Sequence, residues 1–315
     1  MAIRPEWKSR SGILGSRKAA MGKSGFVALV GRPNSGKSTL LNQLLKEKVS
    51  IVSDKPQTTR HKILGILNRD ESQVVFIDTP GIHKPGFELN RRMMQVVEDS
   101  LEGADLLLLL VDVSIPFGKG DLYVLEMLRQ RQMTKILILN KMDLITREQL
   151  LPFMARYSEL YSFAEIVPLS ALRGENLDLL INLILQCLPE GPPYFPKDQY
   201  TDQTERFLVA ELVREKVLLH MQQELPYSTT VQVAQFEDRE ELAVIHCDIY
   251  VERDSQKKIV IGKGGAQLKQ IGMEARPEVE EMLQKRVYLE LFVKVKPHWR
   301  DDPRFLNAMN LGEEK

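Results

Sequence analysis

A glycine-rich segment, GRPNSGKS, occupies residues 31–38 between an apolar run and a helical pattern. The run before it, residues 26–30, is predicted to be a buried strand, and residues 39–45 have the spacing of a helix. The pattern G-x-x-x-x-G-K-[ST] in this strand–loop–helix context is typical of a loop that binds phosphate. A glycine-rich turn that binds nothing is the alternative, and the context argues against it.

Each residue type in this loop has a physical reason. Gly31 and Gly36 permit the tight turn that aims several backbone N–H groups at one point. We expect Lys37 to reach the β- and γ-phosphates of a nucleotide and Ser38 to bind Mg²⁺. The candidate nucleotide-binding residues of the loop are Gly31, Arg32, Pro33, Asn34, Ser35, Gly36, Lys37, Ser38 and Thr39.

A second motif, N-K-M-D at residues 140–143, follows the apolar run 136–139 and is typical of guanine-specific sites. The Asp143 carboxylate can accept hydrogen bonds from guanine N1–H and the exocyclic amine, whereas adenine would leave it unpaired. Asn140 is expected to join this loop to the phosphate loop and face N7, and the Lys141 stem to lie over the base. The base-binding candidates are Asn140, Lys141, Met142 and Asp143, with Ser170 and Ala171 in a loop whose backbone would donate to guanine O6.

Two segments between these motifs are expected to respond to the γ-phosphate. The motif D-T-P-G at residues 78–81 should hold Mg²⁺ through water at Asp78 and contact the γ-phosphate with the Gly81 N–H. Thr59 is expected to close on Mg²⁺ when GTP is bound, with Thr58 as the alternative. The predicted metal ligands are Ser38, Thr59 and Asp78; the catalytic candidates are Lys37, Thr59 and Gly81; and Thr79, Pro80 and Ile82 complete the nucleotide contacts.

Ile82 stands where Ras-like proteins place a glutamine that orients the attacking water. An isoleucine side chain can neither orient nor deprotonate water, so we expect slow intrinsic hydrolysis of GTP. Asn34 is one candidate to compensate, because in related GTPases an asparagine at this loop position helps to hold K⁺ near the phosphates. The other role open to Asn34 is a hydrogen bond that shapes the loop.

Length and composition are those of an ordinary globular protein with two domains. The 315 residues are 43% hydrophobic and 27% charged, and the formal net charge of zero gives no indication of nucleic acid. Cys187 and Cys247 are predicted to be buried thiols of a reducing compartment, without metal-binding spacing. The longest apolar stretch, residues 106–111, is too short to span a bilayer. Residues 1–24 are basic, lack a secretory signal and are predicted to be a disordered extension, with Met21 as an alternative start.

Alternating apolar runs and amphipathic stretches predict an α/β fold for the first part, residues 25–188: a mostly parallel six-stranded sheet with helices on both faces. A turn at 68–72 makes one strand antiparallel. Residues 189–200 are proline-rich and predict a stiff linker before a second domain at 201–315. The predicted strands are near 26–30, 63–67, 74–77, 106–111, 136–139 and 166–169, and the predicted helices near 37–46, 89–102, 120–131, 147–159 and 176–187.

The second domain is predicted to be α+β, with a G-K-G-G segment at residues 262–265. A G-x-x-G loop between helices is typical of KH domains, where glycines let the RNA backbone approach closely, although a simple helix–helix turn has the same string. Trp299 either stacks on bases or packs the C-terminal helix. The predicted elements are a helix over 207–224 ended by Pro226, strands 228–233 and 243–251, helices 266–273 and 277–285, and a strand 287–295. The RNA-binding candidates are Lys257, Lys258, Ile261, Gly262, Lys263, Gly264, Gly265 and Lys269, within a basic surface that also includes Lys294, Lys296 and Arg300.

Together these motifs resemble the Era-type bacterial GTPases, P-loop GTPases with a C-terminal type II KH domain, over about residues 25–310. The segments 56–61, 78–83 and 261–265 fit the pattern of that family, including Ile82. The resemblance implies a GTPase that binds GTP or GDP and Mg²⁺, with K⁺ as a further candidate ligand. Nothing in the sequence demands more than a monomer. The resemblance also implies a role in 30S ribosomal subunit assembly and 16S rRNA maturation, through KH binding to the 3′ end of that rRNA.

The same resemblance implies a cytoplasmic protein that also contacts the cytoplasmic face of the inner membrane. An alternative function is a signalling GTPase whose C-terminal domain is a protein-interaction module. A P-loop ATPase or kinase is a third hypothesis, against which the motif at residues 140–143 argues.

Overall fold

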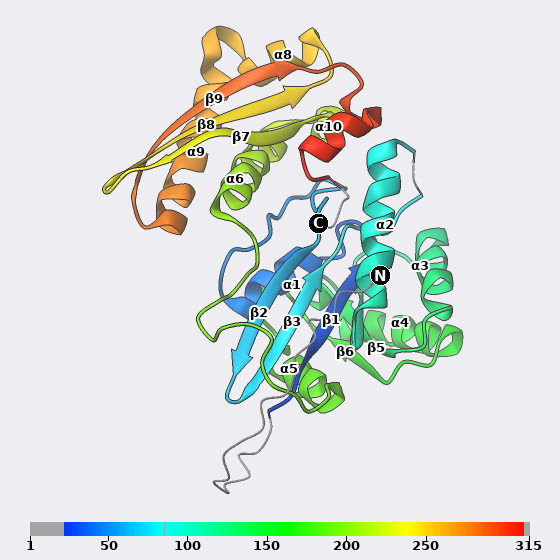
Figure 1. Cartoon of the computed structure of the whole chain (residues 1–315). Helices are drawn as coiled ribbons and strands as arrows, with labels where there is room; N and C mark the ends of the chain where they lie inside the picture. The colour runs from blue at the N-terminus through cyan, green and yellow to red at the C-terminus, as the bar shows by residue number, and fades with distance from the viewer. Residues whose placement is uncertain (1–21, 85, 312–315) are drawn as a thin grey trace, which may run out of the picture.

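The computed structural model describes residues 22–84 and 86–311, which form two units, each built of helices and one sheet (Figure 1). Of the predicted disordered extension, residues 1–24, the first 21 residues lie outside the described residues. Its last residues belong to the structure, because Lys23 forms a bridge with Glu190 and Ser24 begins the first strand.

The first unit has the predicted number and kind of strands and helices, each within a few residues of its predicted bounds. The sheet order is β2-β3-β1-β4-β5-β6, and β2 runs antiparallel to β3 while the other pairs are parallel, as predicted. The strands are β1 Ser24–Gly31, β2 Ile63–Arg69, β3 Ser72–Asp78, β4 Leu106–Asp112, β5 Thr134–Asn140 and β6 Glu165–Pro168. The helices are α1 Lys37–Leu45, α2 Glu88–Glu102, α3 Lys119–Arg129, α4 Arg147–Leu160 and α5 Leu177–Cys187.

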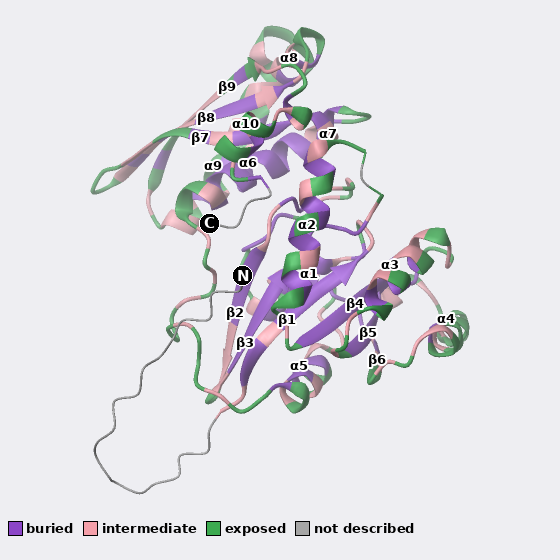
Figure 2. Ribbon diagram, turned by 45° about the vertical axis from the view of Figure 1, so that its right-hand side comes forward, coloured by how far each residue is buried: buried purple, intermediate pink, exposed green. Residues whose placement is uncertain are grey.

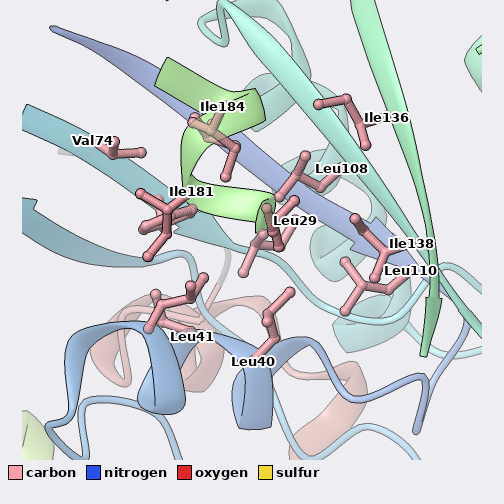
Figure 3. Packing of buried hydrophobic residues seen from close by; sticks show 14 of the residues in the cluster. Leu29, Leu40, Leu41, Val74, Leu108, Leu110, Ile136, Ile138, Ile181 and Ile184 are labelled. Atoms are coloured by element: carbon pink, nitrogen blue, oxygen red, sulfur yellow. The ribbon is translucent and has the colours of Figure 1, made fainter. Parts of the chain in front are cut away.

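The continuous apolar runs of the strands reflect a sheet that is buried on both faces. Because side chains alternate along a strand, Leu29 of β1 belongs to one apolar cluster and Ala28 to another on the opposite face. Figure 3 shows the first cluster, in which Leu40 and Leu41 of α1 and Ile181 of α5 pack on the sheet. The strands β1, β3, β4 and β5 are accordingly coloured as buried along most of their length in Figure 2.

One prediction about the interior is wrong in part. Cys247 is buried as predicted, but Cys187, the last residue of α5, is exposed. The following residue, Leu188, occupies the inner position at this end of the helix and is 3% exposed. An apolar run therefore does not place its final residue on the buried face.

The proline-rich segment 189–200 lies beside the first sheet and includes a turn, in which the Gln199 N–H donates to the Pro196 carbonyl at 3.2 Å. The Gln73 side chain accepts hydrogen bonds from the N–H groups of Tyr194 and Phe195, at 2.7 and 2.9 Å. Further along, the Ile66 N–H donates to the Tyr200 carbonyl at 2.9 Å. These contacts fix the direction in which the chain leaves the first unit.

The second unit is a three-stranded sheet with helices packed on one face (Figure 1). The strand order is β7-β8-β9, with β7 antiparallel and β9 parallel to β8. Its apolar cluster joins all three strands to α6, α8 and α9. The elements are α6 Glu205–His220, α7 Leu225–Ser228, β7 Thr230–Asp238, β8 Leu242–Val251, α8 Asp254–Ile261, α9 Ala266–Leu283, β9 Arg286–Val295 and α10 Pro303–Ala308.

Two predictions for the helices of this unit are wrong. The predicted helices 266–273 and 277–285 are one helix, α9, which continues through Pro277. The predicted helix over 207–224 ends at His220, and Pro226 lies inside the separate short helix α7. Both predictions take a proline as a helix boundary. In α9, buried residues on both sides of Pro277 hold one helix together, whereas Pro226 lies near the start of a new helix.

The chain after β9 returns to the first unit. Trp299 is fully buried, and its Nε1–H donates to the Ser228 carbonyl at 2.9 Å. With Leu306 and Leu311 it belongs to the same apolar cluster as Leu89 of α2. The prediction that Trp299 packs is therefore confirmed, and the alternative that it is exposed to stack on bases is wrong. Among the described residues, no helix is long and apolar enough to cross a membrane.

Candidate functional site

The phosphate loop lies between the end of β1 and the start of α1, as predicted. Gly36 has φ +94°, and a Cβ atom built on it would lie 2.2 Å from the side-chain nitrogen of Asn140. Gly81 is packed as closely, because its Cβ would come 2.7 Å from the backbone of Pro33. Glycine is thus required at both positions by contacts between the loop and the two later motifs.

Lys37 lies inside the loop with no carboxylate within ion-pair distance among the described residues. Its Nζ donates to the carbonyl of Arg32 at 3.2 Å. Burial lowers the pKa of Lys37 to about 8, an effect that Asp78 opposes. A cation in this position is stabilised by anionic oxygens, which the phosphates of a nucleotide supply.

The three predicted metal ligands are brought together. The Ser38 hydroxyl donates to Asp78 Oδ2 at 2.6 Å and lies 2.9 Å from the Thr59 hydroxyl. Asp78 is fully buried, its Oδ1 has no hydrogen-bond partner, and burial raises its pKa. A carboxylate oxygen without a partner beside two hydroxyls is a set of hard oxygen ligands, which fits Mg²⁺.

The structure distinguishes the two threonines proposed for the switch. Thr58 Oγ1 is turned away from the metal position, donating to the Lys55 carbonyl at 2.6 Å and lying 2.6 Å from the Ser53 hydroxyl. Thr59 contacts Ser38, as the prediction required. Thr59 is therefore the better placed of the two.

A cavity of about 320 Å³ opens between the phosphate loop and residues 51–60, hereafter the switch segment. Asn34 joins the two, because its Nδ2 donates to the Asp54 carbonyl at 2.6 Å. This hydrogen bond of Asn34 joins the phosphate loop to the switch segment rather than closing the loop on itself. The residues that line the cavity are Pro33, Asn34, Gly36, Lys37, Ser38, Thr39, Ile51, Val52, Ser53, Asp54, Gln57, Thr58, Thr59, Gly81 and Lys141.

Asn140 connects three loops at the base-binding end. Its Nδ2 donates to the Ser35 carbonyl at 2.8 Å, and its Oδ1 accepts from the Ala171 N–H at 2.9 Å. The Asp143 side chain is 5% exposed and lies 3.7 Å from Arg173. The phosphate loop, the 140–143 motif and the 170–171 loop therefore form one surface, the arrangement that guanine recognition needs.

Ile82 takes no part in this polar surface. Its N–H donates to the Gly31 carbonyl at 2.9 Å, and its side chain is 2% exposed in the apolar cluster with α2. The neighbouring polar groups are His83, whose Nδ1 lies 2.7 Å from the Gly81 carbonyl, and Gln57, 3.5 Å from the other His83 nitrogen. The chain thus replaces the water-orienting glutamine with a core residue.

Sequence reasoning missed several groups at the site. Ser50 donates to Asp78 Oδ2 at 2.9 Å, and Asp112 accepts from Lys141 Nζ at 2.6 Å. Asp112 ends β4, and polar residues at the carboxyl ends of parallel strands are a signal that could have identified it. No motif marks Ser50, which only the fold brings to Asp78.

The G-K-G-G segment lies between α8 and α9 at one end of the second unit. Gly262, Gly264 and Gly265 all have positive φ, and open space surrounds a Cβ at the last two. Glycine is needed here for backbone conformation, with room left for a ligand to approach.

The predicted RNA-binding lysines differ from the other three residues of the predicted basic surface. Among the described residues, Lys257, Lys258, Lys263 and Lys269 pair with no carboxylate. The remaining predicted basic residues are neutralised within the domain. Their ion pairs are Lys294–Asp248, Lys296–Asp302 and Arg300–Glu252. The α8–α9 end thus carries four lysines whose charge no carboxylate among the described residues compensates.

Comparison with known families gives a match for each unit. A family model described as a 50S ribosome-binding GTPase matches residues 26–141, and a KH domain model matches residues 224–300. Two curated relatives are named GTPase Era. The one from Syntrophus aciditrophicus (strain SB) is 49% identical over 93% of this chain and 96% of its own length, and the one from Staphylococcus haemolyticus (strain JCSC1435) is 45% identical over 93% and 98%.

Two solved structures are similar over nearly the whole chain. One is Era in complex with MgGDPNP and nucleotides 1506–1542 of 16S ribosomal RNA, with a TM-score of 0.90 and 41% identity over 93% of this chain and 100% of that chain. The other is an Aquifex aeolicus Era variant bound to GDP and AlF₄⁻, with a TM-score of 0.88 and 41% identity over 92% and 100%.

Proposed function

Because the chain belongs to the GTPase Era family, and is therefore a GTPase with a C-terminal KH domain, we propose that it acts in assembly of the 30S ribosomal subunit. In this proposal the KH domain binds the 3′ end of 16S rRNA and the bound guanine nucleotide controls that binding. The observation that carries it is the presence in one chain of a guanine-nucleotide site and a G-x-x-G loop flanked by unpaired lysines.

At the nucleotide site we propose a division of labour among the chain's own residues. Lys37 and the loop N–H groups bind the phosphates, and the Gly81 N–H meets the γ-phosphate. Ser38, Thr59 and Asp78 hold Mg²⁺, which neutralises charge on the phosphates when bound. Asp143 and Ala171 select guanine. Since Ile82 is buried in the core, intrinsic hydrolysis is slow.

Three further proposals concern a K⁺ ion, the domain boundaries, and the location and oligomeric state of the protein. Asn34 can contribute its side-chain oxygen to a K⁺ ion, because the hydrogen bond to Asp54 uses only its nitrogen.

The domain limits are proposed at residues 25–188, 189–200 and 201–315. The protein is proposed to act as a cytoplasmic monomer that contacts the inner membrane face.

The RNA-binding proposal places the rRNA backbone against Gly262, Lys263, Gly264 and Gly265. Lys257, Lys258 and Lys269 add positive charge on the same end of the domain, and Ile261 adds apolar contact. An interaction module for a protein is the alternative. It is disfavoured because two glycines with positive φ, Gly264 and Gly265, are surrounded by open space.

The test is a titration of a labelled oligonucleotide matching the 3′ end of 16S rRNA, at fixed salt, with protein holding either GDPNP or GDP. The proposal expects tighter, sequence-selective binding in the GDPNP form. A variant with both Lys263→Asp and Gly264→Asp should lose this binding while it retains GTP hydrolysis. Affinity that ignores both sequence and nucleotide would leave a GTPase whose second domain does something else.

A further inference from the structure

The switch segment is held from both sides of Thr59 by the C-terminal unit. On one side Arg214 of α6 donates a hydrogen bond from Nη2 to the Thr58 carbonyl. On the other side the Arg60 guanidinium donates to the carbonyls of Thr229, at 2.8 Å, and Pro226, at 3.0 Å. Both neighbours of the predicted switch threonine are therefore tied to the RNA-binding unit.

These contacts determine where Thr59 lies. The peptide group between Thr58 and Thr59 is planar, so fixing the Thr58 carbonyl fixes the plane that carries the Thr59 N–H. The Arg60 side chain fixes the next residue. Between these two anchors the Thr59 hydroxyl lies 2.9 Å from Ser38, at the proposed metal position.

The two side chains that hold the switch segment, Arg60 and Arg214, are buried and charged, so moving either one away from its partners costs free energy. Arg60 and Arg214 are 2% and 1% exposed, and the nearby carboxylate is that of Glu211, which pairs with Arg214 at 2.6 Å. Arg60 Nε and Arg214 Nη1 have no acceptor. Because one carboxylate serves two guanidinium groups, loss of the Thr58 carbonyl would leave Arg214 further under-compensated.

A second set of contacts links the same helix to the helix that follows the G-K-G-G loop. Glu215 of α6 accepts from the Val52 N–H of the switch segment at 2.9 Å. Lys48 donates to Glu215 at 2.5 Å and to Glu278 of α9 at 2.7 Å. Since α9 begins directly after Gly265, these contacts connect the switch segment to the helix that starts at the G-K-G-G loop.

We propose that Arg214, a residue of the RNA-binding unit, positions Thr59 in the nucleotide site, so that the two domains must be docked for the switch threonine to reach its place. The proposal rests on the function proposed above and names its regulation. Arg214 is a positioning residue, because it touches the Thr58 backbone and not the nucleotide.

The experiment compares Arg214→Gln with Arg206→Gln, measuring affinity for Mg–GDPNP and Mg–GDP and the kcat and KM of GTP hydrolysis. Arg206 is a matched control, since it lies on the same helix and donates to a carbonyl of its own domain, that of Val233. Arg214→Gln should weaken GDPNP binding about tenfold or more, the equivalent of one hydrogen bond to a charged group, and lower kcat. The GDP affinity of Arg214→Gln should stay within about twofold of that of the unmodified protein. Arg206→Gln should change neither the two nucleotide affinities nor kcat.

Equal loss of GDP and GDPNP affinity in Arg214→Gln, or no loss of either, would overturn the proposal, because a purely structural residue has no preference between nucleotides. Arg214→Lys keeps the charge and one donor, and is expected to restore part of the GDPNP affinity. If both variants unfold, hydrogen exchange on the unmodified protein decides. Replacing Mg–GDP by Mg–GDPNP should increase protection in residues 205–228, and unchanged protection there contradicts the proposal.

Failure of this inference differs visibly from failure of the proposed function. If the unmodified protein binds no rRNA oligonucleotide while Arg214→Gln loses GDPNP selectively, the positioning role holds and the proposed RNA target is wrong. If the unmodified protein binds the oligonucleotide in a nucleotide-dependent way and Arg214→Gln behaves as wild type, the proposed RNA target holds and the positioning role of Arg214 is wrong.

Discussion

Asp78 is the residue whose surroundings say most about the ligand. It is fully buried, and burial raises its pKa, while the Lys37 ammonium and the hydroxyls of Ser38 and Ser50 act in the opposite direction. One of its oxygens still has no partner. A buried carboxylate is retained when a cation or hydrogen bonds compensate it, so this site needs the charge that Mg²⁺ brings.

Nucleotide choice is predicted to depend on a single carboxylate. The Asp143→Asn variant should lose GTP affinity by about 100-fold or more, since each hydrogen bond to a charged group is worth about 1.5–3 kcal/mol. It should gain affinity for xanthosine triphosphate, whose base presents an oxygen where guanine has its amine. Competition binding with GTP, XTP and ATP measures this, and unchanged GTP affinity would show that Asp143 does not contact the base.

His61 predicts a dependence of stability on pH. Burial lowers its pKa to about 4, against which Glu211 acts, and the ring packs edge-on against Phe207. Between about pH 6.5 and pH 4 the unfolded histidine binds a proton that the folded one does not, so the free energy of unfolding falls as pH decreases. The loss should be about 1–2 kcal/mol, less than the full shift because part of the ring is exposed.

Denaturant unfolding at pH 7, 6 and 5 provides the measurement for His61. Carboxylates also contribute to acid sensitivity, so the informative quantity is the difference between the unmodified protein and His61→Phe. That variant should have a shallower decline between pH 6.5 and 5. An identical decline in both proteins would rule out His61 as the source.

At the scale of elements, α9 shows how packing overrides local preference. Pro277 lacks the N–H that would donate to the Met273 carbonyl, which favours a helix boundary. The helix nevertheless continues, because Ile271, Ala275 and Val279 are all fully buried on one face across the proline. Burial of that face outweighs one missing hydrogen bond.

This explanation predicts that Pro277→Ala stabilises the protein. Proline in a helix interior costs about 3 kcal/mol relative to alanine, so the free energy of unfolding should rise by about 1–3 kcal/mol. Pro303, at the first position of α10, is the control, because proline is favoured there and Pro303→Ala should give no gain. Thermal and urea unfolding of both variants test the idea, and a loss of stability in Pro277→Ala would mean that the helix needs a bend here.

At the scale of the whole molecule, the two units meet at the switch segment and through the C-terminal tail. The tail places Trp299, Leu306 and Leu311 in the apolar cluster beside α2. The Arg60 guanidinium lies 5.7 Å from the Trp299 ring centroid. The second unit is thus attached to the nucleotide-binding unit at places distant in sequence, which limits how freely it can move.

Removal of the Trp299 ring should therefore weaken the whole molecule. Trp299→Ala is expected to lower the free energy of unfolding by about 3–5 kcal/mol, the usual cost of truncating a large buried ring. Trp299→Phe keeps most of the packing and loses the hydrogen bond to Ser228, at a cost of about 1 kcal/mol. Denaturant unfolding gives both values. Unchanged stability together with weaker RNA binding would point instead to an exposed, base-stacking residue.

The sequence by itself determined the six strands, the five helices around them and the residues expected at the nucleotide site, because these follow from local spacing. Buried strands need apolar runs, and a phosphate loop needs its glycines at fixed intervals. Tertiary structure alone decided that Thr59 rather than Thr58 faces Ser38, that α9 continues through Pro277, and that Trp299 is buried. It also brought Arg214 to the switch segment, 156 residues away in the chain. Such contacts depend on which surfaces of the two units meet, and no pattern of neighbouring residues encodes that.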